Sequence, residues 1–176
     1  MTISLIVVIE ILLSLKLNVV KFQMKWVTRE PAKVDRIACP WLFKRFVDKD
    51  AEILFVPAHK VIEYIKGGKD KAIPFDIPNV DLGPHGEECS FDAIIKKYEL
   101  DKKEPALIEL AKIVRGADTH NRKLTPYSEC LAAIAAGFSI ISKDDYDNMT
   151  KQFPLYDALF EFCKSDHKEK LLSSRH

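Results

Sequence analysis

Short apolar runs separated by polar turns predict three brief strands in the first half of this chain. Apolar and β-branched residues cluster at 25–28 and 52–56, which is the length of ordinary strands. A weaker strand is expected over 72–77, where Pro74 cannot donate a backbone hydrogen bond. That third strand is therefore expected at a sheet edge or at a bulge.

A helical pattern occupies most of the remaining sequence. Apolar stripes, proline at helix starts and glycine after helix ends mark the individual segments. The first helix contains Pro40, so it either kinks or begins there. The predicted helices cover 34–47, 58–66, 90–98 capped by Ser90, 105–115 stopped by Gly116, 125–137 ended by Gly137, a short one capped by Ser142 and Asp145, and 154–163 opened by Pro154. The pattern predicts a helix-rich α+β single domain with a small sheet of about three short strands, without the regular βαβ alternation of a Rossmann sheet.

Composition and charge fit one globular domain and narrow its partners. The chain has 176 residues, 47% of them hydrophobic and 30% charged, with a formal net charge of +1. A dedicated duplex-DNA protein usually carries a basic face, so no nucleic-acid partner is expected for this domain alone. The four cysteines are far apart and form no C-x-x-C pair. This spacing excludes zinc ribbons and thioredoxin motifs and favours reduced thiols in a cytoplasmic protein.

The start of the chain differs from the rest. Residues 1–23 are mostly apolar, but Glu10 and Lys16 would be costly in a bilayer, and the flanks of a signal peptide are missing. We interpret this segment as an extension upstream of a natural start at Met24, with a poor membrane anchor as the alternative. The predicted parts are the extension 1–23, the domain 24–163 and a polar, frayed tail 164–176.

The first candidate cluster combines two arginines and a cysteine near the start of the first helix. Arg29 and Arg36 could grip an oxyanion with planar, bidentate donors. Arg36 and Cys39 are three residues apart, so they share a helix face, and a guanidinium near a thiol lowers the pKa of that thiol. The structural alternative is that Asp35 pairs with an arginine at the surface while Cys39 packs in the core.

The second cluster, at 85–92, holds histidine, glutamate, cysteine and aspartate just before a helix. His85 and Cys89 suit a divalent metal such as zinc or ferrous iron, and the helix N-terminus favours a thiolate at Cys89. Two ligands are not a complete metal site. The alternative is a polar loop in which Asp92 only complements the helix dipole.

The third cluster follows the predicted helix stop. Asp118 could complete a metal site with His85 and Cys89, or orient His85 as a hydrogen-bond acceptor. A simple Asx-type turn is the alternative, and it is the reading we favour for His120. No Walker loop, G-x-G-x-x-G, G-x-S-x-G or H-E-x-x-H motif occurs. The nucleotide-dependent, serine-hydrolase and zincin classes therefore lose their support.

These clusters fall within seven sequence blocks that resemble one protein family. In chain order the blocks are WVTRE at 26–30, DRIACPWL at 35–42, FVP at 55–57, IPFD at 73–76, HGEECSFD at 85–92, IVRGADT at 113–119 and YDAL at 156–159. By these blocks, residues 24–163 are similar to the C-terminal domain of the chromate-resistance family ChrB. The resemblance implies a role in bacterial or archaeal chromate resistance. It does not extend to the N-terminal regulatory region of that family.

The resemblance leaves the biochemical activity open among three functions. The first, which we favour, is a domain that binds or senses an oxyanion or a metal. Chromate is a tetrahedral dianion and sulfate is nearly isosteric with it, so planar guanidinium donors suit either ligand. The ligand-binding donors are expected to be Arg29, Arg36 and Arg115.

The second function is a metal- or thiol-dependent enzyme of redox or sulfur chemistry, because relatives of this domain are also found joined to rhodanese-like sulfurtransferase domains. Its metal would be held by His85, Cys89 and Asp118, and Cys39 would be the catalytic thiol. The third function is a structural partner of a chromate transporter, associated with a membrane through residues 1–23.

Overall fold

The computed structural model describes residues 24–67 and 71–173, and the first half of the fold is built on a parallel sheet. Strand β1 (Lys25–Arg29) lies in the centre, between β2 (Glu52–Val56) and β3 (Ile73–Pro74). Both neighbours run parallel to β1. Strand β3 is at an edge of the sheet, as its proline predicts.

Helices connect these strands in turn. Helix α2 (Val34–Leu42) continues as a π-helical turn, η1 (Phe43–Val47), and leads from β1 to β2. The 3₁₀ turn η2 (Ala58–Lys60) and helix α3 (Val61–Lys66) then lead to β3. The expected lack of βαβ alternation is therefore wrong for this half. The strands are five, five and two residues long, too short for their apolar pattern to reveal parallel pairing.

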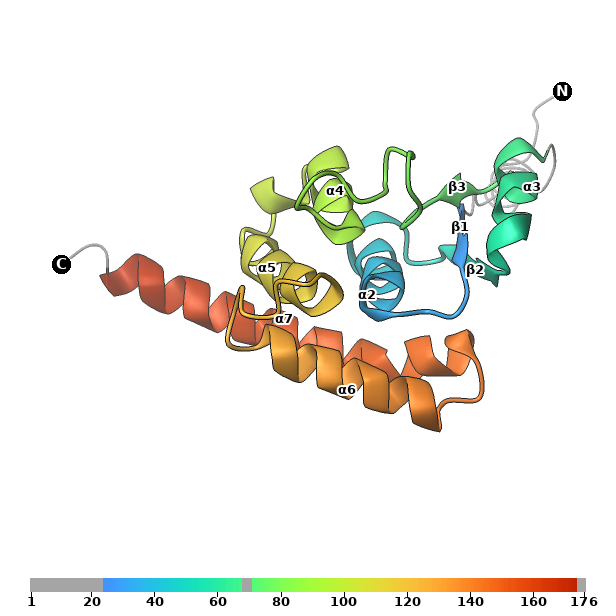
Figure 1. The fold of residues 1–176 in the computed structure, drawn as a ribbon. Coiled ribbons are helices and arrows are strands. Elements are labelled where there is room, and N and C mark those ends of the chain that lie inside the picture. The colour runs from blue at the N-terminus through green and yellow to red at the C-terminus, as the bar shows by residue number, and fades with distance from the viewer. Residues whose placement is uncertain (1–23, 68–70, 174–176) are drawn as a thin grey trace, which may run out of the picture.

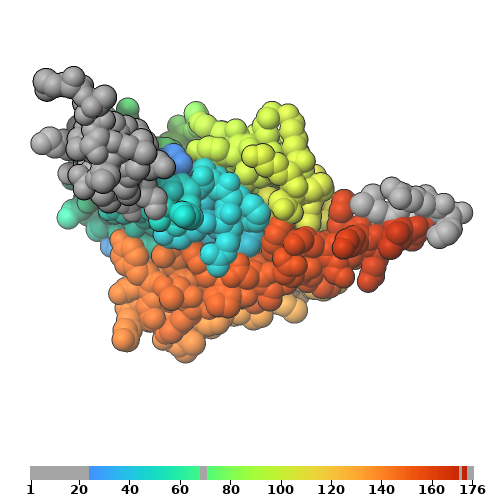
Figure 2. Space-filling view, turned by 180° about the vertical axis from the view of Figure 1, so that it is seen from behind, coloured from blue at the N-terminus to red at the C-terminus, as the bar shows by residue number. Residues whose placement is uncertain are grey.

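The second half of the chain is helical. Its elements are α4 (Ser90–Lys97), the 3₁₀ turn η3 (Leu100–Lys102), α5 (Ala106–Asp118), α6 (Ser128–Ile141) and α7 (Asp145–Ser173). Helix α2 packs against α4, α5 and α7, so it lies between the sheet and the other helices (Figure 1). The C-terminal end of α7 projects past the other elements (Figure 2). The predicted helix-rich α+β domain with three short strands is confirmed.

Aromatic side chains from both halves fill one core. Trp26 of β1 stacks on Phe43, with ring centroids 3.7 Å apart. Trp41 of α2 is 1% exposed and packs against Tyr156 and Phe160 of α7. A buried aromatic side chain removes about 150–250 Å² from water. These contacts therefore hold the sheet and the helical half together.

Gly116 serves helix packing instead of helix termination. Helix α5 passes through this residue and ends at Asp118. A Cβ built on Gly116 would lie 2.2 Å from Oγ of Ser128, the first residue of α6. The same hydroxyl donates a hydrogen bond to the carbonyl oxygen of Ile113 at 3.1 Å. The predicted stop at Gly116 is wrong because the missing side chain makes room for a neighbouring helix.

The last two helices are also longer than predicted. Helix α6 runs past Gly137, and α7 contains Pro154 instead of beginning there. The carboxylate of Asp144, and not the hydroxyl of Ser142, caps α7, since it accepts a hydrogen bond from a first-turn N–H at 2.8 Å. The helix continues through 164–173, so that part of the predicted polar tail is helical. Packing of α7 on the core outweighs the hydrogen bond that a proline removes.

No helix within residues 24–67 and 71–173 is long and apolar enough to cross a membrane. The predicted extension 1–23, with its alternative as a membrane anchor, lies outside the described residues. The division of the chain into 1–23, 24–163 and 164–176 stays a prediction.

Candidate functional site

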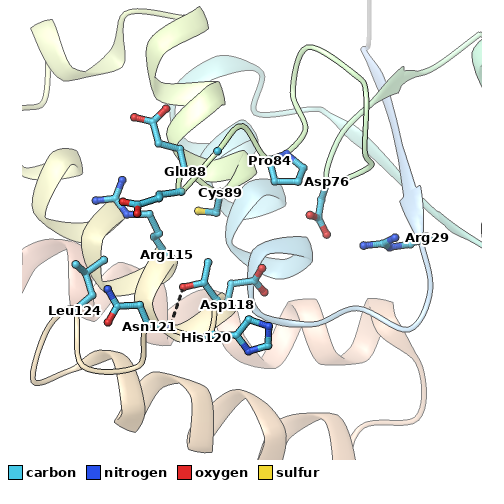
Figure 3. Close-up of a pocket in the computed structure, with 13 residues that line it drawn as sticks. Arg29, Asp76, Pro84, Glu88, Cys89, Arg115, Asp118, His120, Asn121 and Leu124 are labelled. Carbon is cyan, nitrogen blue, oxygen red and sulfur yellow. Dashed lines mark hydrogen bonds between the residues drawn. The ribbon is translucent and has the colours of Figure 1, made fainter.

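A cavity of about 770 Å³ opens at the carboxyl ends of β1 and β3. Arg29 ends β1 and Asp76 follows β3, and both line the cavity. The chain passes from β1 to β2 on one side and then to β3 on the other, so the strand order reverses here. Crevices at such points are the usual ligand sites of parallel sheets. The helical half contributes Glu88, Cys89, Arg115, Asp118 and His120 to the lining (Figure 3).

The buried carboxylate of Asp35 joins three of the helices around this cavity. Its oxygens accept hydrogen bonds from the backbone N–H groups of Ser90 at 2.7 Å and Phe91 at 3.3 Å, at the start of α4. Its own N–H donates to Oδ1 of Asp118, at the end of α5, at 3.2 Å. A carboxylate at a helix N-terminus satisfies free donors and complements the helix dipole. Asp35 therefore determines where α2, α4 and α5 meet.

The two carboxyl groups in this contact have raised pKa values. Burial is the largest cause for Asp35, and the negative charges of Asp118 and Asp76 raise its pKa further. Burial is also the largest cause of the raised pKa of Asp118, and Asp76 adds to it, while the N–H of Asp35 and the guanidinium of Arg36 oppose the shift. Asp118 lines the cavity. Its carboxyl group is therefore protonated more readily, and in that state it can donate a hydrogen bond to a ligand.

The guanidinium of Arg36 is committed to a buried ion pair. Its Nε lies 2.6 Å from Oδ2 of Asp76, and both side chains are 9% exposed. Arg36 also donates to the carbonyl oxygen of Pro31. It is not among the residues that line the cavity. The structure thus does not bring Arg36 to the cavity with Arg29; its guanidinium neutralises Asp76 instead.

Arg29 and Arg115 bring positive charge to the cavity from opposite sides (Figure 3). Nη1 of Arg115 lies 3.3 Å from Oδ1 of Asp92, so that carboxylate neutralises part of its charge. The guanidinium of Arg29 has no hydrogen-bond or ion-pair partner within the described parts of the chain. Its planar set of donors is therefore left for a ligand.

The cysteines near the cavity are buried thiols. Cys39 is 0% exposed, and burial together with the charge of Asp35 raises its pKa well above the usual range. Cys89, and not Ser90, is the N-cap residue of α4, and it lines the cavity. Burial and the carboxylates of Asp35 and Asp92 raise the pKa of Cys89. These effects oppose the thiolate that the helix N-terminus favours, and the thiol of Cys89 donates a hydrogen bond to Oδ2 of Asp92 at 3.3 Å. Cys39 packs in the core, as in the alternative interpretation.

The structure does not gather the predicted metal ligands into one cluster. Cys89 and Asp118 both line the cavity, whereas His85 does not. Nε2 of His85 lies 3.1 Å from the carbonyl oxygen of Asp81, in its own loop. Within residues 24–67 and 71–173, no group of three or more histidine, cysteine, aspartate or glutamate side chains could hold a metal ion. A zinc or iron site stays a prediction from the sequence.

Asp35 and Asp76 are the site residues whose roles the sequence does not reveal. Asp35 is 1% exposed, so the surface pairing expected for it is wrong. Asp76 lies in the IPFD block and has a φ of 49°, in the left-handed region that a short aspartate side chain tolerates. A carboxylate just after a strand of a parallel sheet lies at the ligand edge. That signal can be used only once the parallel pairing is known.

Comparison with known proteins decides the family. A family model described as ChrB, C-terminal domain, matches residues 26–163. The chain belongs to this family. It is also 27% identical over 121 residues to Protein ChrB from Cupriavidus metallidurans, an alignment that covers 69% of this chain and 35% of that protein. No solved structure matches the chain.

The ChrB C-terminal domain match contains every residue that lines the cavity. It also contains the buried pair of Arg36 and Asp76 and the carboxylate of Asp35. The chain spans about a third of the length of the curated ChrB protein that it matches, so the comparison concerns this domain and not the whole relative. The resemblance drawn from the seven blocks is confirmed at the level of the family.

Proposed function

We propose that this ChrB C-terminal domain acts in chromate resistance by binding a small tetrahedral oxyanion, with chromate as the expected ligand, in the cavity at the end of β1. Family membership supports the association with chromate resistance. The guanidinium of Arg29 is the observation that favours an oxyanion as the ligand. It lines the cavity and has no partner in the described parts of the chain. A guanidinium offers planar, bidentate hydrogen bonds that match an oxyanion.

Most carboxylates around the cavity are neutralised or screened, so they do not cancel the positive charge of Arg29. Asp76 is paired with Arg36 at 2.6 Å, and Glu88 is paired with Lys96 at 2.6 Å. Glu87 also lines the cavity, but it is exposed, so water and salt screen its charge. A dianion beside Arg29 would therefore meet few uncompensated negative charges.

Asp118 gives the proposed site a pH dependence. Burial raises the pKa of its carboxyl group, so protonation occurs at a higher pH than in an ordinary aspartate. The protonated group donates a hydrogen bond to an oxyanion, whereas the ionised group repels one. Sulfate stays a dianion over this range. Its binding is expected to weaken as the pH rises through the raised pKa of Asp118.

Thermal stabilisation by sulfate tests the proposal without the redox chemistry of chromate. A ligand that binds only the folded protein stabilises it by about 2.7 kcal/mol at 100 times its Kd. We expect sulfate to raise the Tm of the wild type but not that of Arg29→Ala, at an ionic strength matched with chloride. Arg45→Ala is the control, because Arg45 pairs with Asp157 at 2.8 Å outside the cavity. Equal stabilisation of the wild type and Arg29→Ala would refute the assignment.

A further inference from the structure

The cavity at the end of β1 is much larger than a tetrahedral oxyanion. Its volume is about 770 Å³. The oxygens of a tetrahedral oxyanion displace at most about four water molecules, or roughly 120 Å³ at about 30 Å³ each. Cavities of about 300–1,000 Å³ usually hold organic ligands and cofactors. An oxyanion at Arg29 would therefore leave most of the cavity for another part of a ligand.

Arg115 offers a second cationic group, on the opposite side of the cavity from Arg29 (Figure 3). Its contact in the described parts of the chain joins Nη1 to Oδ1 of Asp92 at 3.3 Å. Hydrogen bonds between a guanidinium and a carboxylate are usually shorter, about 2.7–2.9 Å. Oδ2 of Asp92 already accepts bonds from the N–H and the thiol of Cys89, at 3.1 and 3.3 Å. Arg115 is therefore held loosely and keeps most of its N–H donors for a ligand.

The wall that α5 contributes continues with groups that can donate hydrogen bonds. Asp118 follows Arg115 by three residues, so both side chains lie on the same face of the helix. Burial raises the pKa of Asp118, which favours the protonated carboxyl group. The hydroxyl of Thr119 accepts a hydrogen bond from the N–H of Asn121 at 3.3 Å, so its own proton is left to donate. Thr119 and Asn121 both line the cavity. These groups suit the polar body of a ligand whose charges lie at its ends.

We infer that the cavity binds an elongated organic molecule with an anionic group at each end, one at Arg29 and the other at Arg115. The inference rests on the proposed oxyanion contact at Arg29 and extends it across the cavity. A free tetrahedral oxyanion occupies only the Arg29 end of such a site. Two anionic groups joined in one molecule bind more tightly than one alone, because the second contact is made within the complex.

Isothermal titration calorimetry with alkyl phosphonates tests the inference, in a buffer free of divalent cations. A phosphonate is a tetrahedral oxyanion attached to carbon. Methylphosphonate carries one such group, and a series of α,ω-alkane bisphosphonates carries two groups at increasing separation. The bisphosphonate of matching length should bind the wild type about tenfold more tightly than methylphosphonate, or better, and shorter and longer chains should bind less well. A monophosphonate with the same alkyl chain should bind like methylphosphonate, because it lacks the second anionic group.

Substitutions at the two ends separate their contributions. Arg115→Gln should bind the best bisphosphonate no more tightly than methylphosphonate, while its affinity for methylphosphonate stays that of the wild type. Arg29→Ala should weaken the binding of both probes. Lys112→Gln is the matched control, because Lys112 lies on the same helix, pairs with Glu109 at 2.9 Å and does not line the cavity. It should bind both probes like the wild type.

The outcomes distinguish this inference from the oxyanion site itself. Methylphosphonate binding that depends on Arg29, with no bisphosphonate binding more tightly, would overturn the inference and leave the oxyanion site in place. An equal gain for bisphosphonates in the wild type and Arg115→Gln would also overturn it, because the second group would lie elsewhere. No binding of any probe would refute both the inference and the proposed function.

Circular dichroism checks that Arg115→Gln is folded. Should it not be, the two probes with the same alkyl chain decide the matter on the wild type. Tighter binding of the bisphosphonate than of the monophosphonate supports a second cationic contact. Equal affinity of the two would contradict it, because the gain would then come from the alkyl chain.

Discussion

Replacing Arg36 by leucine is expected to cost the fold far more than replacing Arg29. The guanidinium of Arg36 lies 2.6 Å from the carboxylate of Asp76, and both side chains are 9% exposed. Removing one partner of a buried ion pair leaves an uncompensated charge, which costs about 3–5 kcal/mol. The guanidinium of Arg29 has no such partner in the described residues. A substitution away from such features usually changes stability by less than roughly 0.5 kcal/mol.

Thermal and urea unfolding measure this difference. At about 2–4 °C per kcal/mol for a chain of this size, Arg36→Leu should lower the Tm by roughly 6–20 °C. A double-mutant cycle with Asp76→Asn isolates the pair, and the double variant should lose less stability than the two single variants together. A loss below about 1 kcal/mol for Arg36→Leu, similar to that of Arg29→Leu, would show that the pair is not buried. Arg36 would then be free to bind a ligand, as its sequence position suggests.

Gly116→Ala should destabilise the protein by about 1–3 kcal/mol in urea unfolding, because the new Cβ would lie 2.2 Å from Oγ of Ser128; an unchanged midpoint would mean that α5 and α6 separate easily. Asp118→Asn should reduce the pH dependence of stability. The raised pKa of Asp118 means that the folded chain binds more protons than the unfolded chain above about pH 4, so wild-type stability falls as the pH rises through this window. An equally steep fall of stability with pH in the variant would show that Asp118 does not cause the pH dependence. Cys130 should react fastest with a maleimide at low protein concentration, because the other cysteines in the described residues are buried; a fast phase that survives Cys130→Ser would reveal a reactive buried thiol.

The sequence pattern predicts the elements of this fold better than the contacts between them. The strands near 25–28 and 52–56 and most helices are visible because apolar periodicity, proline and glycine are local signals. Parallel pairing joins residues far apart in the chain, and a strand of two residues carries no pattern of its own. Gly116 shows the same limit, since its role depends on Ser128 of a different helix.

For the candidate site too, the sequence predicts the residues better than the interactions between them. The sequence predicts four site residues that all line one cavity: Arg29, Cys89, Arg115 and Asp118. Arg29 is the last residue of a strand and the other three lie at or near helix ends, which are the places where a parallel sheet and its helices form ligand crevices. The charge state of each group depends on distant partners. Asp76 lies 40 residues from Arg36 and neutralises its charge, and no local sequence motif predicts this pairing.

The position of a bound tetrahedral dianion in a crystal tests the oxyanion site most directly. Selenate has the shape and charge of sulfate, and the anomalous scattering of selenium locates it. We predict a selenium peak inside the cavity, with a selenate oxygen about 2.7–3.2 Å from a guanidinium nitrogen of Arg29. The same soak of Arg29→Ala crystals should give no peak there. Selenate found only at surface lysines of the wild type, with the cavity empty at saturating concentration, would contradict the oxyanion site.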